Sequence, residues 1–94
     1  MGGETVPKIV VIHDVGDIDT WLKGKQERAD AIATMGGSNV KDYVAQDGSK
    51  TIAITGDVDD VDAMLAQIAS PPPDLMGAMQ RHTVVPPMKV FVER

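Results

Sequence analysis

The stretch Ile9-Val10-Val11-Ile12-His13-Asp14-Val15-Gly16-Asp17-Ile18-Asp19-Thr20-Trp21-Leu22 decides the fold of this chain. Its first residues are apolar at every position, which predicts a strand over about residues 6–13 that is buried on both faces. A helix follows the turn at Gly16, and either Asp17 or Asp19 can cap it by accepting hydrogen bonds from the free N–H groups at its start. The stretch therefore predicts a strand, a tight turn and a capped helix.

The rest of the chain continues this alternation. Helical spacing of apolar residues predicts one helix up to Met35, ended by Gly36 and Gly37. The dipeptide Asp47-Gly48 predicts a tight hairpin with positive φ at both central residues. In order, the expected elements after the first strand are a helix over 18–35, strands over 40–46 and 50–55, a helix over 58–69, a short helix after Ser70-Pro71-Pro72-Pro73 capped by the serine, and a strand over 88–93.

The order strand, helix, strand, strand, helix, strand predicts a four-stranded antiparallel sheet with both helices on one face, because crossovers are right-handed. The opposite face is then bare. In the first strand it holds either Ile9 and Val11 or Val10 and Ile12, and Phe91 or the set Met88, Val90 and Val92 adds to it. An apolar sheet face of this kind marks an interface. We therefore expect a homodimer formed through the sheet face.

Length and charge limit the function. The chain has 94 residues, no cysteine and a net charge of −5. We expect one domain over residues 6–94 after a flexible N-terminus, residues 1–5. There is no basic stripe to neutralise phosphates, so neither nucleic acid nor a membrane surface is an expected partner. No signal peptide or membrane span is visible, and we expect a cytoplasmic protein.

Three groups of residues carry a resemblance to a known family. They are the opening Val15-x-Asp17-x-Asp19-x-Trp21, the hairpin between two short strands, and the run from Asp57 to Met64 that precedes the run from Ser70 to Met79. Together these resemble the small dimeric α/β-barrel proteins, a ferredoxin-like superfamily that includes antibiotic-biosynthesis-type monooxygenases, haem-degrading monooxygenases and many uncharacterised members. The resemblance covers about residues 8–93.

The resemblance implies homodimers whose sheets face each other and a pocket between sheet and helices. Members with known activity often work without a metal or an organic cofactor, and none is expected here. The haem-degrading branch uses an Asn on the first strand together with a Trp and a His. This chain has Ile, Val and His on that strand and lacks the Asn. For this reason we do not expect haem degradation here.

The two histidines are the candidate catalytic residues. His13 ends the first strand, where it can act as a general base near neutral pH or simply be satisfied by backbone or water. His82 follows the second helical region, where it either reaches the same end of the sheet or caps the helix in solvent. Trp21 and Tyr43 are candidate ligand-binding residues, although a lone Trp on a helical stripe more often fills a core or an interface.

No metal site is expected. The acidic run Asp57, Asp59, Asp60 and Asp62 lacks the glycine and the twelfth-position glutamate of a calcium loop, and it suits the start of a helix instead. Two function hypotheses remain. The first is a homodimeric protein that binds a small, largely apolar molecule and oxidises or isomerises it without a cofactor. The second is a non-catalytic accessory or interaction protein of the same fold, whose pocket is filled by its own side chains.

Overall fold

The computed structural model describes residues 6–94. The expected flexible N-terminus, residues 1–5, lies outside the described residues. The elements alternate as the sequence predicts, with each helical region divided in two. In chain order they are β1 (Lys8–Val15), α1 (Ile18–Lys23), α2 (Lys25–Thr34), β2 (Gly37–Val44), β3 (Thr51–Val58), α3 (Val61–Ala69), α4 (Pro73–Arg81) and β4 (Val84–Val92).

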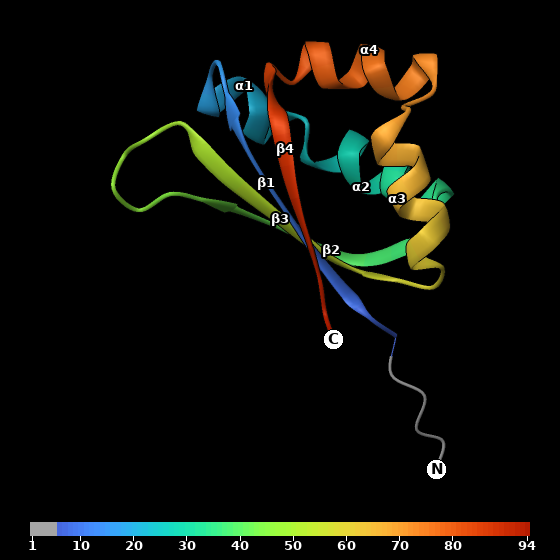
Figure 1. The fold of residues 1–94 in the computed structure, drawn as a ribbon. Helices are drawn as coiled ribbons and strands as arrows, with labels where there is room; N and C mark the ends of the chain where they lie inside the picture. The colour runs from blue at the N-terminus through green and yellow to red at the C-terminus, as the bar shows by residue number, and fades with distance from the viewer. Residues whose placement is uncertain (1–5) are drawn as a thin grey trace.

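The strands form one antiparallel sheet in the order β2-β3-β1-β4. The helices lie together on one side of this sheet, with α4 at the top of the view and α3 at the right (Figure 1). This arrangement confirms the predicted βαββαβ fold with helices on one face. Lys8 fastens the start of β1 to the end of β3 through an ion pair with Asp57, whose Nζ–Oδ1 distance is 2.9 Å.

Burial along β1 identifies which residues face the helices. Ile9, His13 and Val15 are buried, and the alternation of a strand places Val11 on the same face. Val10 and Ile12 therefore belong to the bare face, and the pairing of Val10 with Phe91 brings that ring to it. The structure thus decides between the two sets that the sequence leaves open.

The first helical region is broken at Gly24, where the sequence predicts one continuous helix to Met35. Gly24 is both the C-cap of α1 and the N-cap of α2. The break has a packing reason, because a Cβ at this position would lie 2.5 Å from Nε2 of His82. The backbone therefore passes directly against the imidazole. Asp17, and not Asp19, is the cap of α1, since its carboxylate accepts from the backbone N–H of Asp19.

Three other expectations about local structure need correction. In the loop between β2 and β3, Gly48 has positive φ but Asp47 does not, and the N–H of Gly48 bonds to the carbonyl of Ala45. The connection is thus a longer loop than the predicted two-residue turn. Ser70 caps the end of α3 and does not begin α4, which starts at Pro73 without a side-chain cap. Val58 belongs to β3, so α3 begins only at Val61.

The last strand begins earlier than predicted because it contains a bulge. Ile12 pairs with Lys89 and Asp14 pairs with Val85, so residues 86–88 of β4 lie opposite His13 alone. Pro86 and Pro87 have no backbone N–H to give to a ladder, and prolines within a sheet are confined to edge strands and bulges. The bulge interrupts the sheet pairing beside His13. Bulges of this kind often change the direction of the side chains next to them.

Two groups of buried apolar side chains fill the space between sheet and helices. One contains Ile9, Val58 and Met64, and the other contains Val15, Trp21 and Ile52. On β1, His13 lies between Ile9 of the first group and Val15 of the second. The histidine therefore interrupts an otherwise apolar layer, and its surroundings define the candidate site.

Candidate functional site

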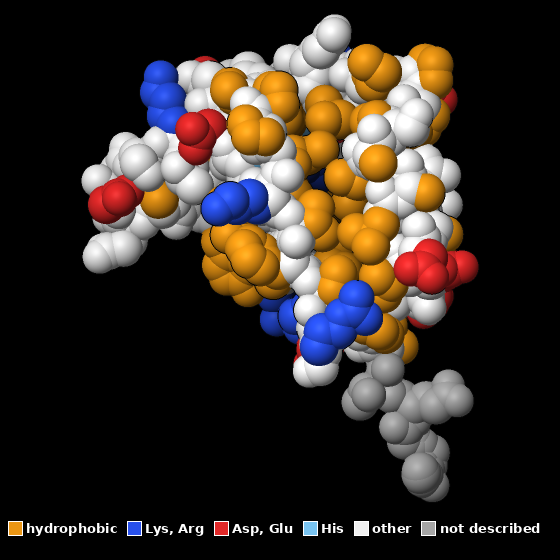
Figure 2. Space-filling model, viewed as in Figure 1, with side chains coloured by type: hydrophobic (Ala, Val, Ile, Leu, Met, Phe, Trp, Pro, Cys, Tyr) orange, Lys and Arg blue, Asp and Glu red, His pale blue; other side chains and the backbone are white. Residues whose placement is uncertain are grey.

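A cavity of about 110 Å³ lies between the sheet and the helices. Strands β1, β3 and β4 form its floor, and α2, α3 and α4 form its walls, with Leu75 and Met79 contributed by α4. In Figure 2 the hydrophobic side chains line a hollow that opens between β4 and the α3–α4 side of the molecule. Met64 lines the cavity from α3, and Met88 lines it from β4. This is the pocket that the resemblance implies.

The cavity is almost wholly apolar, with His13 as the exception on the helix face. Thr55 also borders the cavity, but it pairs with Val10 on β1, and its side chain therefore lies on the opposite face of the sheet. Among the lining residues within 6–94, no side chain carries a formal charge at neutral pH. A ligand in this space would meet one imidazole and otherwise hydrocarbon and sulfur.

The orientation of the His13 ring follows from one hydrogen bond. Its Nδ1 lies 2.8 Å from the backbone carbonyl oxygen of Asp14. A carbonyl oxygen can only accept, so Nδ1 carries the proton. In the neutral ring Nε2 then has a free lone pair, and no described residue supplies a hydrogen bond to it. Of the two readings that the sequence leaves open, the geometry shows the backbone hydrogen bond, and it leaves Nε2 unpaired.

The environment of His13 lowers its pKa below the ordinary value of 6.5. Burial has the largest effect because it penalises the charged imidazolium, and the positive charge of Arg28 adds to it. The hydrogen bond to the carbonyl of Asp14 and the Asp14 carboxylate act in the opposite direction. The net effect favours a neutral imidazole at neutral pH, which is the form that can accept a proton.

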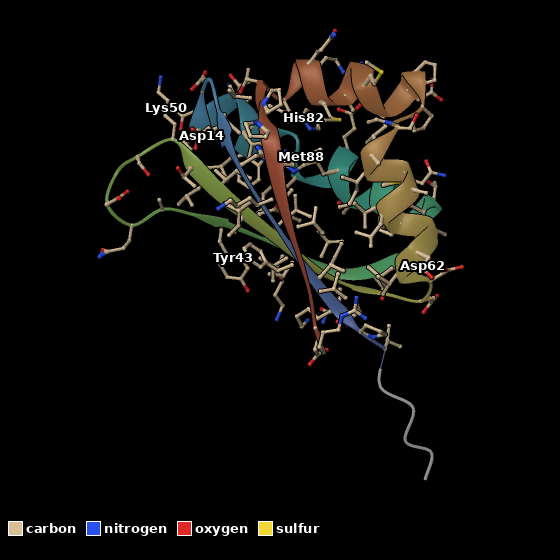
Figure 3. All side chains as sticks on the ribbon, viewed as in Figure 1. Asp14, Tyr43, Lys50, Asp62, His82 and Met88 are labelled. Carbon is tan, nitrogen blue, oxygen red and sulfur yellow. The ribbon has the colours of Figure 1, made fainter. Side chains whose placement is uncertain are left out.

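His82 lies elsewhere and is not among the residues that line the cavity. It is the C-cap of α4 and is only 4% exposed. Nε2 lies 2.7 Å from Oε1 of Glu27, and Nδ1 lies 3.3 Å from Nη1 of Arg28. Figure 3 places His82 beneath α4, on the side of the first helices. The structure therefore does not bring the two histidines together at the cavity, and His82 does not cap its helix in solvent.

Trp21 is also outside the cavity lining. It is fully buried against Val15 and Ile52, and the guanidinium of Arg28 stacks 4.0 Å from the centre of its ring. Within the described part of the chain, its indole N–H is the buried side-chain polar group without a hydrogen-bond partner. Its position fits the alternative of core filling that the sequence leaves open.

Tyr43 lies on the bare face of the sheet. It pairs with Ala53, whose neighbours Ile52 and Ile54 face the helices, so Tyr43 and Ala53 face the other way. Its side chain is 49% exposed and points away from the helices (Figure 3). A ligand in the cavity would not meet this ring.

Sequence reasoning missed Arg28, which is 8% exposed. Its guanidinium forms an ion pair with Asp42 at 3.3 Å and donates to the carbonyl oxygen of Trp21. A signal was present, because Arg28 follows Trp21 by seven residues and falls on the same helical stripe. The side chain of Glu27 is exposed and forms ion-pair contacts with both His82 and Arg81.

The acidic run serves the start of α3 in part, while its first member, Asp57, lies in β3. Asp60 caps α3 by accepting from the N–H of Ala63 at 3.1 Å, and Asp57 binds Lys8. Within residues 6–94, no three histidine or acidic side chains gather as metal ligands. In the same part of the chain, no helix combines the length and apolar character needed to cross a membrane.

A second hollow of about 390 Å³ lies among α2, α3 and α4. Its walls are mixed, because apolar residues such as Leu75 and Ala78 alternate with polar ones that include Glu27 and Arg81. Glu27 and Arg81 already neutralise each other as an ion pair. The apolar cavity remains the better candidate site because it contains an unpaired basic nitrogen.

Comparisons with solved structures show what this chain is similar to. A protein from Bordetella bronchiseptica, named as a candidate antibiotic biosynthesis monooxygenase, superposes with a TM-score of 0.73 at 12% identity, over 94% of each chain. SnoaB, a cofactor-independent oxygenase from Streptomyces nogalater, gives a TM-score of 0.63 at 15% identity, over 94% of this chain and 92% of its own. A further candidate antibiotic biosynthesis monooxygenase, from Deinococcus radiodurans, gives 0.57 at 15% identity, over 93% of this chain and 90% of its own.

No protein-family model matches the sequence. No curated protein matches it either. The likeness is therefore one of fold at low sequence identity. It confirms the expected resemblance, because the chain has the fold of the dimeric α/β-barrel proteins of the antibiotic biosynthesis monooxygenase type.

Proposed function

We propose that this protein is a homodimeric α/β-barrel enzyme that binds a small, largely apolar molecule in the cavity and removes a proton from it without a cofactor. The observation that carries the proposal is the free Nε2 lone pair of His13 in an apolar cavity. The fold it shares with SnoaB, a cofactor-independent oxygenase, supports the same reaction class. His13 is the proposed base, whereas Trp21, Tyr43 and His82 lie outside the cavity.

The chemistry begins when Nε2 of His13 takes a proton from an acidic C–H group of the substrate. In an oxygenase, the resulting carbanion then reacts with dioxygen. One oxygen atom enters the product as a carbonyl and the other leaves as water, so a CH₂ group and O₂ become C=O and H₂O. In an isomerase, the imidazolium returns its proton to a different carbon. Both routes need the neutral imidazole that burial favours.

Association through the bare face is part of the proposal. Val10, Ile12, Ala53, Tyr43 and Phe91 lie on that face, and Phe91 is 52% exposed. A monomer would leave this apolar sheet in water, and a second copy packed face to face would cover it. The fold supports this arrangement, since the relatives share the dimeric α/β-barrel type.

The alternative is a non-catalytic accessory or interaction protein. One observation favours it: the cavity measures about 110 Å³, and pockets for drug-sized ligands begin at roughly 300 Å³. The protein's own side chains thus fill much of the space between sheet and helices. An enzyme with this cavity has to use a small substrate.

The test uses phenylacetone, a small carbon acid, in D₂O under air. Deuteration of its methylene group is followed by NMR and oxygen uptake by an electrode, with wild type, His13→Gln and the control Lys23→Gln. Lys23 is exposed and does not line the cavity. We expect wild type and the control to accelerate deuteration and His13→Gln to lose about 100-fold of that acceleration, the size of a general-base contribution. Binding without acceleration by wild type would favour the accessory protein.

A further inference from the structure

The wall of the cavity is unusual in composition. Four of the six methionines of the chain line it, namely Met35, Met64, Met79 and Met88. Met35 is the C-cap of α2, and the other three come from α3, α4 and β4, so no single helical stripe accounts for their gathering. No aromatic side chain joins them among the described lining residues. The concentration of thioethers around one space calls for a chemical reason.

Thioethers differ from hydrocarbon in two respects that matter for a ligand. Sulfur is polarizable and makes favourable contacts with aromatic rings, often at the ring edge. The unbranched methionine side chain also has several rotatable bonds, so it can adapt to a flat guest. A cavity with thioethers on several sides and no aromatic ring of its own therefore suits one aromatic ring supplied from outside.

The size of the cavity limits that ring to one. The space measures about 110 Å³. An apolar cavity of about 150 Å³ in another protein is large enough to bind benzene. A single ring with a small substituent fits here if the methionines adjust, particularly because the space opens between β4 and the α3–α4 side (Figure 2).

His13 specifies the substituent. Its Nδ1 donates to the carbonyl of Asp14, so its Nε2 can only accept in the neutral ring. A ligand that reaches this nitrogen gains a hydrogen bond if it carries an O–H or N–H group. A ligand that offers only an acceptor leaves both partners unsatisfied.

From these observations we infer that the cavity binds a one-ring arene with a hydrogen-bond donor on the ring, of which phenol is the simplest member. The ring lies among the four methionines and the donor faces Nε2 of His13. This inference rests on the proposed function, because it names the ligand class of the same site. It adds a preference for an aromatic ring, which His13 alone does not give.

The experiment follows the methyl groups of ¹³C-methyl-labelled methionine by NMR while phenol, cyclohexanol or methoxybenzene is added to the full chain. Met76, which is 50% exposed on α4 and does not line the cavity, is the internal control. We expect phenol to shift the methyl signals of Met64, Met79 and Met88 saturably and to leave that of Met76 in place. Cyclohexanol tests the need for an arene, and methoxybenzene tests the need for a donor. Each should bind about tenfold more weakly than phenol, the equivalent of one lost neutral hydrogen bond or ring contact.

Two variants test which side chain produces each preference of the cavity. Met64→Leu keeps the volume of the side chain and removes its sulfur. It should therefore weaken the binding of phenol and leave the binding of cyclohexanol unchanged. His13→Leu should abolish the preference for phenol over methoxybenzene. Equal binding of phenol and cyclohexanol by wild type would overturn the arene preference, and equal binding of phenol and methoxybenzene would overturn the role of Nε2. In both cases the cavity still binds apolar molecules, so that part of the proposed function stands, and the deuteration test with His13→Gln decides separately whether His13 acts as the base. If no probe moves the cavity methyl groups, the proposed function fails together with the inference.

Discussion

Nη1 of Arg28 lies 3.3 Å from Nδ1 of His82, and both residues are buried. A guanidinium has no acceptor, so this contact is a hydrogen bond only if Nδ1 of the imidazole is unprotonated. In that case Nε2 carries the proton and donates a hydrogen bond to Oε1 of Glu27, at a distance of 2.7 Å. His82 thus links α2 to the end of α4, and α4 supplies part of the cavity wall.

Replacement of Arg28 by methionine should destabilise the protein by about 3 kcal/mol, because it leaves the buried carboxylate of Asp42 without its partner. The exposed residue Lys25 lies on the same helix and provides the control, Lys25→Met, which should change stability by less than about 0.5 kcal/mol. Urea unfolding followed by circular dichroism measures both. Equal stability of the two variants would contradict the importance of the Arg28 network.

An alanine at Gly24 should cost about 1–3 kcal/mol, because its Cβ would lie 2.5 Å from Nε2 of His82. The same change at Gly77, within α4, places its Cβ 3.4 Å from the flexible end of Arg81 and should be neutral or stabilising. In the background His82→Ala, the penalty of Gly24→Ala should largely disappear. If Gly24→Ala is equally destabilising in the His82→Ala background, the strain does not come from contact with the imidazole.

Stability should depend on pH through His13, whose folded-state pKa is lowered chiefly by burial. Below about pH 6.5 the unfolded chain binds a proton at this residue before the folded chain does, so acid favours unfolding. The stability that His13 contributes is therefore present above that pH and is lost as the pH falls towards the folded-state value. We expect the free energy of unfolding of wild type, relative to His13→Gln, to fall between about pH 7.5 and about pH 5.5. Parallel pH profiles for the two proteins would refute this.

A negative charge at Phe91 should dissociate or unfold the proposed dimer, since an unpaired charge buried in an interface costs several kcal/mol. Phe91 is 52% exposed on the bare face of the sheet. Met76→Glu is the matched control, because Met76 is 50% exposed on α4, away from that face. Sedimentation velocity at micromolar concentration should give a dimer for wild type and for the control and a smaller species for Phe91→Glu. A monomeric wild type would remove the dimer from the proposal.

The fold follows from local sequence features. The apolar run of β1 predicts a strand between two layers, Asp17 is one of two candidate caps for the first helix, and Gly36 marks a helix end. These are interactions between residues close in sequence, and the order of elements with right-handed crossovers then leaves one sheet topology. The candidate His13 also came from sequence, because it was the polar residue at the end of an apolar strand.

What surrounds His13 was decided by tertiary structure. The bulge at Pro86 and Pro87 places residues 86–88 opposite His13, and the methionines reach the cavity from elements far apart in the chain. The separation of His82 from the cavity depends on its contacts with Glu27 and Arg28, more than fifty residues away. Periodicity shows which face of an element is apolar, but only the packing of elements against one another shows which side chains meet. For this reason the sequence by itself determined the order of strands and helices and offered two candidate histidines, whereas the tertiary structure decided which residues cap the helices, the cavity, its thioether wall and the separate positions of the two histidines.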